Sequence, residues 1–347
     1  MYVTKLVLDW FDDSKRELPF RNTTNPYFIW LSEIMLQQTQ VKTVIPYYNR
    51  WMEKFPTIRD VAKSDINVLL KHWEGLGYYK RLHNIKNAAD IVVSEYKGIM
   101  PKGDLLRSLP GIGDYIYSAI SSIAYNEQTP VIDGNVKRVS SRYWGKNFQT
   151  QVELKNLFNL LNKNIDKNSP GDFNQALMDL GREVCKPKQP LCNICPIEKT
   201  CYAYDHNQVD LFPIKNVKKN IPIYDVVVAY IENNKKFIIT KRPTNKMLGG
   251  LWELPGGKRE KGEKLEQALK REIQEELNIS IEVRKKIGKV QHTYSHMKIN
   301  LHGFKCDVKK GKIKCKQADD LQWINLNEIS DYAFPKANHK LFAILGL

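Results

Sequence analysis

The sequence predicts an all-α domain followed by an α+β domain. Up to about residue 200, apolar residues recur with the 3.6-residue period of helices, and Pro, Gly and Asn interrupt them. Further along the chain, β-branched runs that are typical of strands take over. At 347 residues, of which 42% are hydrophobic, the chain is long enough for two domains with separate cores.

The first domain is predicted over residues 1–203 as about ten short helices without a strand. The clearest helical periods fall at residues 6–11, 28–36, 68–73, 85–96 and 116–124. A later helix is expected to end at about residue 183, and a loop with four cysteines follows at 185–201. A polar linker is predicted over residues 204–221, where the apolar pattern fades.

The second domain is predicted over residues 222–347. Residues 265–277 form one strongly helical segment within it. Strands are expected where β-branched residues gather, at 226–231, 237–240, 299–304 and 321–324. A helical part followed by a part that mixes strands and helix is the basis of the predicted fold class.

Net charge narrows the classes of function. The formal charge of +16 favours a polyanionic partner, because phosphate contacts dominate the affinity of basic proteins for nucleic acid. A lysine-rich genome would give the same surplus of positive charge, so the net charge alone does not establish nucleic-acid binding. No apolar run approaches the ~20 residues of a membrane span. The six cysteines and the absence of a signal peptide indicate a reducing, cytoplasmic environment.

Four cysteines form the pattern C-x6-C-x2-C-x5-C and can ligate one metal centre: Cys185, Cys192, Cys195 and Cys201. Disulfides are disfavoured in a reducing cytosol. Structural zinc usually takes two short C-x2–4-C hooks, whereas this loop has one. The uneven spacing favours four-thiolate ligation of a 4Fe–4S cluster, with zinc as the alternative. Cys306 and Cys315 lie far off and are expected to be ordinary thiols.

A glycine-rich turn, L-P-G-I-G, joins two helical segments at residues 109–113. Gly111 and Gly113 let the backbone come close to another molecule. Amides that leave such a turn beside the start of the next helix, near Asp114, form an anion site suited to a DNA phosphate. Many proteins join helices in this way, so the turn alone does not identify a DNA-binding protein.

The order of these motifs resembles the endonuclease III superfamily of DNA glycosylases and, within it, the MutY family of adenine glycosylases, over nearly the whole chain. The resemblance is carried by LPFR (18–21), WLSEIMLQQTQV (30–41), GLGYY (75–79), LPGIG (109–113), VIDGNVKR (131–138) and the four cysteines. Phe20 stands where the family more often has Trp. The resemblance implies a helix-hairpin-helix glycosylase domain with an iron–sulfur loop.

Cleavage of a purine N-glycosidic bond needs a proton on the leaving base and stabilisation of a cationic sugar, which two carboxyls in different environments can supply. Glu33 lies on an apolar helix, where burial would raise its pKa. Asp133 is expected to cap a helix as a carboxylate. By residue type alone, a surface glutamate and a plain helix cap are the simpler interpretations. The resemblance implies instead that Glu33 is the acid and that Asp133 stabilises the oxocarbenium ion or briefly bonds to it.

Tyr115 stands where superfamily members that also cut the DNA backbone carry a Schiff-base lysine. The resemblance therefore implies a monofunctional enzyme, with Tyr115 near Asp133 and the sugar. The target base must leave the helix stack, and Gln38 and Tyr78 match positions that probe and wedge the duplex. Further candidates for phosphate contact or support of the active site are Arg21, Lys137 and Arg138.

Residues 257–279 resemble the Nudix box, with Asn278 where that family has Gly. Glu272, Glu275 and Glu276 share one helix face and could hold Mg²⁺ at a diphosphate, although a solvated charged face is the simpler alternative. Asn278 is expected to loosen the helix exit rather than to remove a metal ligand. The resemblance implies a Nudix fold, as in the MutY domain that recognises 8-oxoguanine.

Two further segments resemble loops that recognise bases. Ser295 and His296 match a MutY loop that touches the oxidised guanine. Asn338, in FPKAN (334–338), matches a segment of the 8-oxo-dGTP hydrolase MutT whose Asn bonds the oxidised base. A loop serine and a turn asparagine are the simpler interpretations.

Together the sequence predicts an all-α helix-hairpin-helix glycosylase domain with an iron–sulfur loop, followed by an α+β Nudix-like domain. We expect a monofunctional adenine glycosylase of base excision repair, acting on adenine opposite 8-oxoguanine or guanine in double-stranded DNA. We also expect a cytoplasmic, nucleoid-associated bacterial monomer without membrane contact. A fusion that also hydrolyses 8-oxo-dGTP with Mg²⁺ is the alternative. Tyr115 argues against an endonuclease III-like lyase, and the two carboxyls argue against a non-catalytic DNA-binding module.

Overall fold

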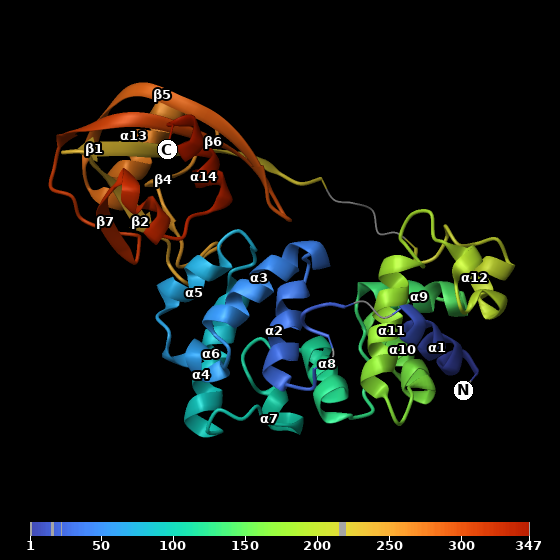
Figure 1. Ribbon diagram of the computed structural model, residues 1–347. Coiled ribbons are helices and arrows are strands. Elements are labelled where there is room, and N and C mark those ends of the chain that lie inside the picture. The colour runs from blue at the N-terminus through green and yellow to red at the C-terminus, as the bar shows by residue number, and fades with distance from the viewer. Residues whose placement is uncertain (1, 15–16, 22, 215–219, 347) are drawn as a thin grey trace. The chain divides into compact units, whose positions relative to one another are not determined.

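The computed structural model describes residues 2–14, 17–21, 23–214 and 220–346, and the chain forms two compact units (Figure 1). The first comprises Met1–Ala62 and Asn84–Val217, and the second comprises Lys63–His83 and Lys218–Leu347. The second unit therefore includes a short piece of the helical part of the sequence, which the predicted boundaries at 203 and 222 do not contain. Residues 215–219 of the predicted linker lie outside the described residues.

Helices build the first unit throughout its described residues, as predicted. They are α1 (Tyr2–Ser14), α2 (Pro26–Leu36), α3 (Val41–Lys54), α4 (Ile58–Lys63), α6 (Lys80–Glu95), α7 (Gly103–Arg107), α8 (Asp114–Tyr125), α9 (Gly134–Trp144), α10 (Gln151–Asn164), α11 (Pro170–Glu183) and α12 (Tyr202–Asp205), with 3-10 turns η1 (Cys192–Ile194) and η2 (Glu198–Thr200). The beginning of α6 belongs to the second unit. Among the described residues, no helix combines the length and the apolar character that a membrane crossing requires.

Capping chemistry sets the ends of α9, whose buried residues belong to the apolar core of this unit. The side chain of Asp133 accepts a hydrogen bond from the backbone N–H of Val136 and so fixes the first turn. Gly145 ends the helix with φ +60°, a left-handed conformation that glycine adopts at little cost. Asp133, the residue that caps the start of α9, is therefore also one of the predicted catalytic residues.

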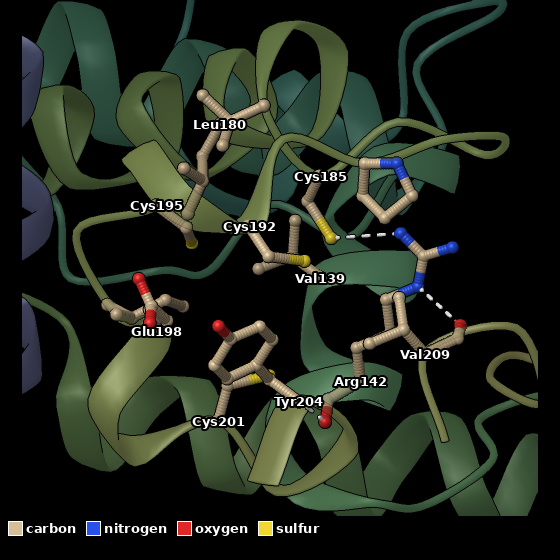
Figure 2. A pocket seen from close by; sticks show the side chains of 13 residues that line it. Val139, Arg142, Leu180, Cys185, Cys192, Cys195, Glu198, Cys201, Tyr204 and Val209 are labelled. Carbon is tan, nitrogen blue, oxygen red and sulfur yellow. Dashed lines mark hydrogen bonds between the residues drawn. The ribbon is translucent and has the colours of Figure 1, made fainter. Parts of the chain in front are cut away.

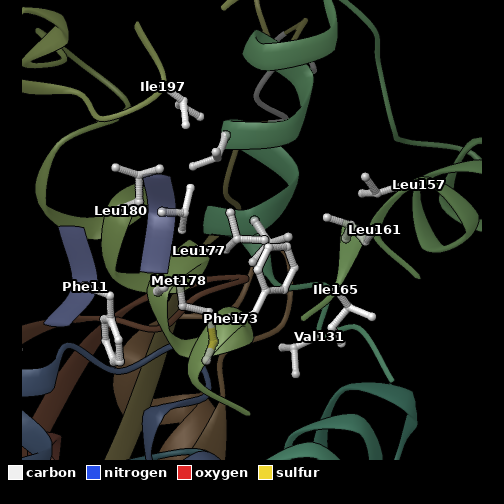
Figure 3. Packing of buried hydrophobic residues seen from close by; sticks show 14 of the residues in the cluster. Phe11, Val131, Leu157, Leu161, Ile165, Phe173, Leu177, Met178, Leu180 and Ile197 are labelled. Atoms are coloured by element: carbon white, nitrogen blue, oxygen red, sulfur yellow. The ribbon is translucent and has the colours of Figure 1, made fainter. Parts of the chain in front are cut away.

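One apolar core joins α1, α9, α10 and α11 (Figure 3). Phe11, Phe173 and Leu180 are at most 3% exposed, and Val136 and Leu161 pack in the same cluster. Burial of each such side chain contributes roughly 1.5–3 kcal/mol to folding. This core fixes α9 against α11, and with them Asp133 at the start of one helix and the cysteine loop that follows the other.

The second unit contains α5 (Ile66–Trp73) and a seven-stranded mixed sheet. Its strands are β1 (Ile223–Asn233), β2 (Lys236–Lys241), β3 (Trp252–Glu253), β4 (Gly256–Lys258), β5 (Ser280–Thr293), β6 (Lys298–Lys310) and β7 (Asp320–Asn325). The sheet runs in the order β3-β2-β1-β6-β5, with β4 paired to β1 and β7 to β2. β1 and β6 are parallel, whereas β5 and β6 are antiparallel.

Helices cover both faces of this sheet (Figure 1). Successive residues of a strand point to opposite faces, so Val227 packs with α13 (Leu265–Leu277), whereas Val228 packs with α14 (Lys336–Ile344). A 3-10 helix, η3 (Leu326–Asp331), precedes α14. The predicted helix over 265–277 and all four predicted strands are present, and the α+β class is confirmed.

Candidate active site and accessory sites

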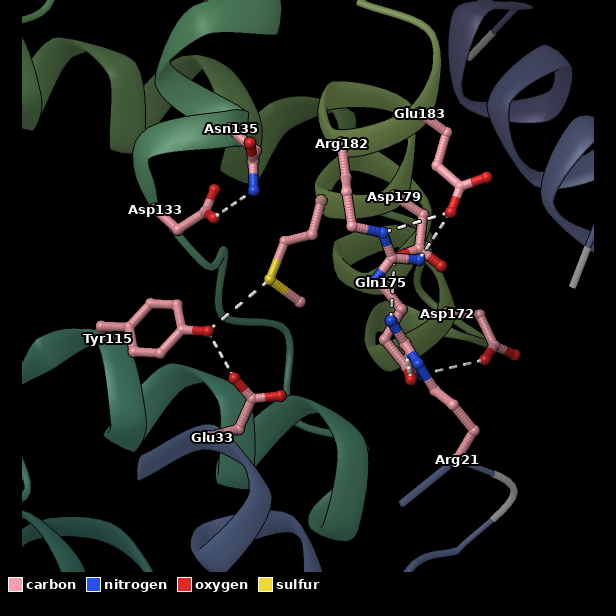
Figure 4. A network of polar contacts seen from close by, with 11 residues as sticks. Arg21, Glu33, Tyr115, Asp133, Asn135, Asp172, Gln175, Asp179, Arg182 and Glu183 are labelled. Carbon is pink, nitrogen blue, oxygen red and sulfur yellow. Dashed lines mark hydrogen bonds and ion pairs between the residues drawn. The ribbon is translucent and has the colours of Figure 1, made fainter. Parts of the chain in front are cut away.

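A pocket of about 400 Å³ in the first unit contains both predicted catalytic carboxyls (Figure 4). Glu33 reaches it from α2, Tyr115 from α8 and Asp133 from the start of α9. Asp179 of α11 closes another side. Side chains from α2, α8, α11 and the start of α9 thus meet around one cavity.

Glu33 has the environment expected of an acid. It is 7% exposed, and the Tyr115 hydroxyl donates a hydrogen bond to its Oε2. Burial raises the pKa of Glu33; the Tyr115 hydrogen bond and the Arg21 charge oppose the rise, and the nearby Asp133 and Asp179 carboxyls add to it. Tyr115 lines the pocket beside Asp133 as predicted, but its hydroxyl is bonded to Glu33.

Asp133 is held in one orientation by two N–H groups. Its Oδ1 accepts from the backbone of Val136 at 2.6 Å, and its Oδ2 accepts from Nδ2 of Asn135 at 3.0 Å. Burial raises the pKa of Asp133, while these hydrogen bonds and the positive charge of Arg138 lower it. The N–H bonds favour the carboxylate, so the two carboxyls differ in what surrounds them.

Arg21 makes hydrogen bonds within the protein, which favours support of the site, one of the two roles expected for it, over phosphate contact. Its guanidinium donates to Oε1 of Gln175 and, at 3.0 Å, to Oδ1 of Asp179. Asp179 also pairs with Arg182 at 3.0 Å (Figure 4). The sequence analysis missed Gln175 and Asp179, although their i, i+4 spacing on the buried face of α11 was a signal that both point the same way.

Arg138 also makes its hydrogen bonds inside the protein, which favours support of the site, one of the two roles expected for it, over phosphate contact. Its Nε donates to the carbonyl of Cys185 at 2.8 Å, and its Nη2 donates to the Gly181 carbonyl at 2.6 Å and to Oδ1 of Asn135 at 2.9 Å. The neighbouring Lys137 is half-buried and stays a candidate for phosphate contact.

The glycine turn between α7 and α8 has the predicted helix-hairpin-helix form. Gly111 has φ +80°, and a Cβ there would lie 2.8 Å from Cβ of Asn84, so the position admits only glycine comfortably. Gly113 is exposed and caps α8, and apart from its two chain neighbours none of the described residues has an atom within 4 Å of the place its Cβ would take. This leaves the start of a twelve-residue helix open on the surface.

The two residues expected to probe and wedge the duplex both have left-handed backbones. Gln38, just after α2, has φ +56° and is exposed. Tyr78 has φ +52° and is 40% exposed, with the Arg81 guanidinium 5.2 Å from its ring centroid. Such conformations are costly for bulky residues and are found at functional sites.

The four cysteine thiols line one cavity between α9, α11 and the loop after it (Figure 2). All four are free and half-buried. Nη1 of Arg142 lies 3.3 Å from Sγ of Cys185, and the apolar wall includes Val139 and Leu180. In the part of the chain that the structure describes, no three His, Cys, Asp or Glu side chains are grouped as ligands of a single metal ion.

The donor set of this loop fits a metal cluster. Burial raises the pKa of Cys192 and Cys201, and that of Cys195 to about 12. Backbone N–H groups of Ile197 and Ala203 point at Cys195 and Cys201 and favour their thiolates. Four partly buried thiols with amides aimed at the sulfurs match the surroundings of a cysteine-ligated iron–sulfur centre.

A second pocket, of about 260 Å³, lies in the sheet unit and includes part of the Nudix box. Glu272 and Glu276 line it, whereas the side chain of Glu275 is 45% exposed and lies outside the lining. Oε2 of Glu276 accepts from the Gly256 N–H at 3.0 Å, and burial raises the pKa of Glu276 to about 8. The structure therefore brings two of the three predicted magnesium ligands together.

Asn278 does not loosen the end of α13, contrary to expectation. It ends the helix with φ +59°, and its N–H donates to the Gln274 carbonyl at 3.1 Å. Asparagine tolerates this left-handed conformation better than most residues that carry a side chain. The substitution for glycine therefore keeps the local geometry of the box.

The residues proposed to recognise a base lie in two different places. Asn338, on α14, is 3% exposed and lines the Nudix pocket. Ser295 and His296 form an exposed bend between β5 and β6, where Tyr294 and Met297 beside them line the pocket instead. Ser295 and His296 therefore face solvent, and only Asn338 faces the cavity.

Comparison with known proteins agrees with both units. Residues 31–163 match the HhH-GPD superfamily of base excision DNA repair proteins, and residues 226–343 match the NUDIX domain. The chain is 28% identical to a thermostable thymine-DNA glycosylase of known structure, with a TM-score of 0.55 over 58% of this chain and 95% of that one.

Similar full-length relatives carry one name. An adenine DNA glycosylase of Arabidopsis thaliana is 33% identical over 91% of this chain, which spans 60% of that protein. An adenine DNA glycosylase of Buchnera aphidicola (subspecies Schizaphis graminum) is 32% identical over 98% of both chains. The chain is a DNA glycosylase of base excision repair and belongs to the adenine DNA glycosylase family.

Proposed function

We propose that this enzyme removes adenine that lies opposite 8-oxoguanine or guanine in duplex DNA and leaves the strand intact. The observation that carries the proposal is the pocket in which the buried, tyrosine-bonded Glu33 and the amide-bonded Asp133 meet. One carboxyl is set to hold a proton and the other to hold a negative charge, as acid-assisted departure of a base requires.

In the proposed reaction, Glu33 gives its proton to a ring nitrogen of the flipped adenine. The C1′–N9 bond then breaks, and its electron pair leaves with the base. The Asp133 carboxylate stabilises the positive charge on the sugar. Water adds to C1′ and releases a proton, which balances the proton that Glu33 gave.

The absence of strand cleavage is proposed from the pocket's chemistry. A lyase forms a Schiff base and needs an amine at the sugar. None of the described residues that line this pocket is a lysine, and Tyr115 presents a phenol bonded to Glu33. A pocket lined in this way supports hydrolysis of the glycosidic bond without Schiff-base cleavage of the strand.

The cysteine loop is proposed to hold a 4Fe–4S cluster through Cys185, Cys192, Cys195 and Cys201. A cluster of several irons binds each thiolate through a different iron, so its ligands stand further apart than those of one zinc ion. The thiols share one cavity, and their uneven spacing with a single short hook favours the cluster over zinc. Its expected role is structural, since Arg138 and Arg142 connect the loop to α9.

A second activity, Mg²⁺-dependent hydrolysis of 8-oxo-dGTP, is favoured by one observation. Glu272, Glu276 and the buried Asn338 line the same cavity in the sheet unit. Carboxylates would hold the metal at a diphosphate, and Asn338 offers both a donor and an acceptor to a base.

One assay tests both proposals. The full chain is incubated with a duplex that contains a single adenine opposite 8-oxoguanine, and in parallel with 8-oxo-dGTP and Mg²⁺. Alkali-labile sites without cleavage before alkali treatment are expected at the adenine. Abundant trapping on DNA by borohydride would contradict the monofunctional mechanism, and release of pyrophosphate would establish the second activity.

A further inference from the structure

Residues 63–83, named here the seat segment, belong to the second unit and contact the sheet-forming part of that unit at several places. Nζ of Lys241 donates to Oδ1 of Asn67 at 2.7 Å, and Nε2 of His83 lies 3.0 Å from the Gly249 carbonyl oxygen. A Cβ on Gly250 would lie 3.1 Å from Cδ1 of Leu70, so the Leu70 side chain packs closely on the Gly250 backbone. The seat segment and the sheet therefore form one body.

The carboxylate of Glu74 has three partners within hydrogen-bond distance: the Phe334 backbone N–H, His339 and Lys71. Its Oε1 accepts from the Phe334 backbone N–H at 2.7 Å, and Nε2 of His339 lies 2.7 Å from the same oxygen. Lys71 bridges its Oε2 at 2.7 Å to the Tyr332 carbonyl at 3.0 Å. The side chain of Glu74 is 16% exposed; burial opposes its ionisation, but the bonds from His339, Lys71 and Phe334 lower its pKa.

A functional turn begins directly after Glu74. Tyr78 follows four residues later with its left-handed backbone, and the turn is pinned by the Trp73 indole N–H, which donates to the Gly77 carbonyl at 3.0 Å. The Gly75 N–H donates to the Tyr79 hydroxyl, also at 3.0 Å. A shift of Glu74 is therefore expected to move Tyr78 as well, because a short turn held by these two hydrogen bonds connects them.

The other partner of Glu74 is the segment that carries Asn338. Glu74 contacts this segment at its first residue, Phe334, and at His339, the residue that follows its end. Asn338 is buried and lines the pocket that includes Glu272 and Glu276. One carboxylate thus joins the turn that presents Tyr78 to the segment that presents Asn338, within the second unit.

We infer that Glu74 is a positioning residue that holds the Tyr78 turn in register with residues 334–338, so that insertion at the mispair and inspection of the base opposite adenine are coupled. This inference rests on the proposed action on adenine opposite 8-oxoguanine. The coupling acts on recognition of the opposite base and not on the chemistry at Glu33.

The test uses the full chain and single-turnover excision of adenine opposite 8-oxoguanine and opposite guanine. Glu74→Ala should slow excision opposite 8-oxoguanine about tenfold, the typical effect of losing a hydrogen bond to a charged group. Excision opposite guanine should change less than about twofold, because the inferred coupling acts through inspection of the oxidised base. Glu74→Gln, which keeps one acceptor oxygen, should lie between Glu74→Ala and wild type.

Asp65→Asn is the matched control, because it removes the same charge at the other end of α5 while an asparagine still caps the helix. Hydrogen exchange at the Phe334 amide gives a second readout that does not depend on catalysis. Exchange should accelerate in Glu74→Ala and stay unchanged in Asp65→Asn.

The outcomes separate the two claims. If wild type does not favour adenine opposite 8-oxoguanine, the proposed function is wrong, and the exchange measurement still decides whether Glu74 clamps Phe334. Equal slowing on both duplexes, or no slowing with faster exchange, would overturn the positioning role. Loss of the preference in Glu74→Ala, with partial recovery in Glu74→Gln, supports it.

Discussion

The hydroxyl of Tyr115 on α8 donates a hydrogen bond to Oε2 of Glu33 on α2. The pair connects α8, the helix after the glycine turn at residues 109–113, to α2, the helix that carries the proposed acid. The same hydroxyl lies 3.8 Å from Sδ of Met178, so it also contacts a third helix, α11. Tyr115, expected near Asp133 and the sugar, therefore also orients Glu33 and, against the larger effect of burial, lowers its pKa.

Glu33→Gln should abolish adenine release while mismatch binding persists. Loss of a general acid typically costs 10²–10⁴-fold in rate, whereas the amide keeps the shape of the side chain. The measurement is single-turnover excision beside a gel-shift titration of the same duplex. Excision at the wild-type rate would remove Glu33 from the acid role.

Tyr115→Phe should move the alkaline limb of the pH–rate profile to higher pH. The tyrosine hydrogen bond favours ionised Glu33, so its removal raises the already raised pKa of Glu33 further. An acid acts only while protonated, so activity persists below that pKa and falls as pH rises through it. An unchanged profile would show that the limb reports another group.

Asp133→Asn separates the capping role from the chemical role. Asparagine is as good a cap as aspartate, so the free energy of unfolding should change by less than ~0.5 kcal/mol. The rate should fall by about 10²–10³-fold, as expected when one electrostatic stabiliser of a transition state is lost. Urea unfolding and single-turnover kinetics give the two values. A matching loss of stability and rate would mean that the cap alone explains the residue.

Local patterns were sufficient where periodicity was regular, as in α13, which has the predicted bounds. β5 was missed because bulges at Val283/Lys285 and Lys286/Gly288 break its alternation. Glu33 and Asp133 were singled out through motif order and line one pocket, yet Asp179 became visible only when α11 packed against that pocket. The internal role of Arg138 depends on carbonyls from a distant loop, which no local pattern contains.

Cys195→Ser should remove the visible absorbance and the iron of the purified protein. The serine hydroxyl is a poor substitute for a buried thiolate ligand. The midpoint temperature of thermal unfolding of the first unit should also fall, because the cysteine loop packs on the same core as α9 and α11. Cys315→Ser is the control, since that thiol is exposed and lies in the other unit. Zinc in place of iron, from cells supplied with both metals, would favour the alternative.

The stability of the second unit should depend on pH through Glu276. Its pKa in the folded chain, about 8, lies above the ordinary value of 4.5, so its favourable contribution is complete below pH 4.5 and is lost as pH rises through 8. Between pH 5.5 and 8.5, with a chelator present, wild type should lose on the order of 1–2 kcal/mol relative to Glu276→Gln. Glu275→Gln, at an exposed position on the same helix, should follow wild type.

Mg²⁺ gives this experiment a functional arm. If Glu276 contributes to a metal site, Mg²⁺ should restore the unfolding free energy of wild type at pH 8.5 and leave Glu276→Gln unchanged, because ion binding stabilises only a fold that keeps its ligand. Recovery that is equal in both proteins would assign the ion elsewhere. Absence of recovery would leave the raised pKa as a property of a buried carboxyl bonded to the Gly256 N–H, and the acidic residues of the box would then have a structural role.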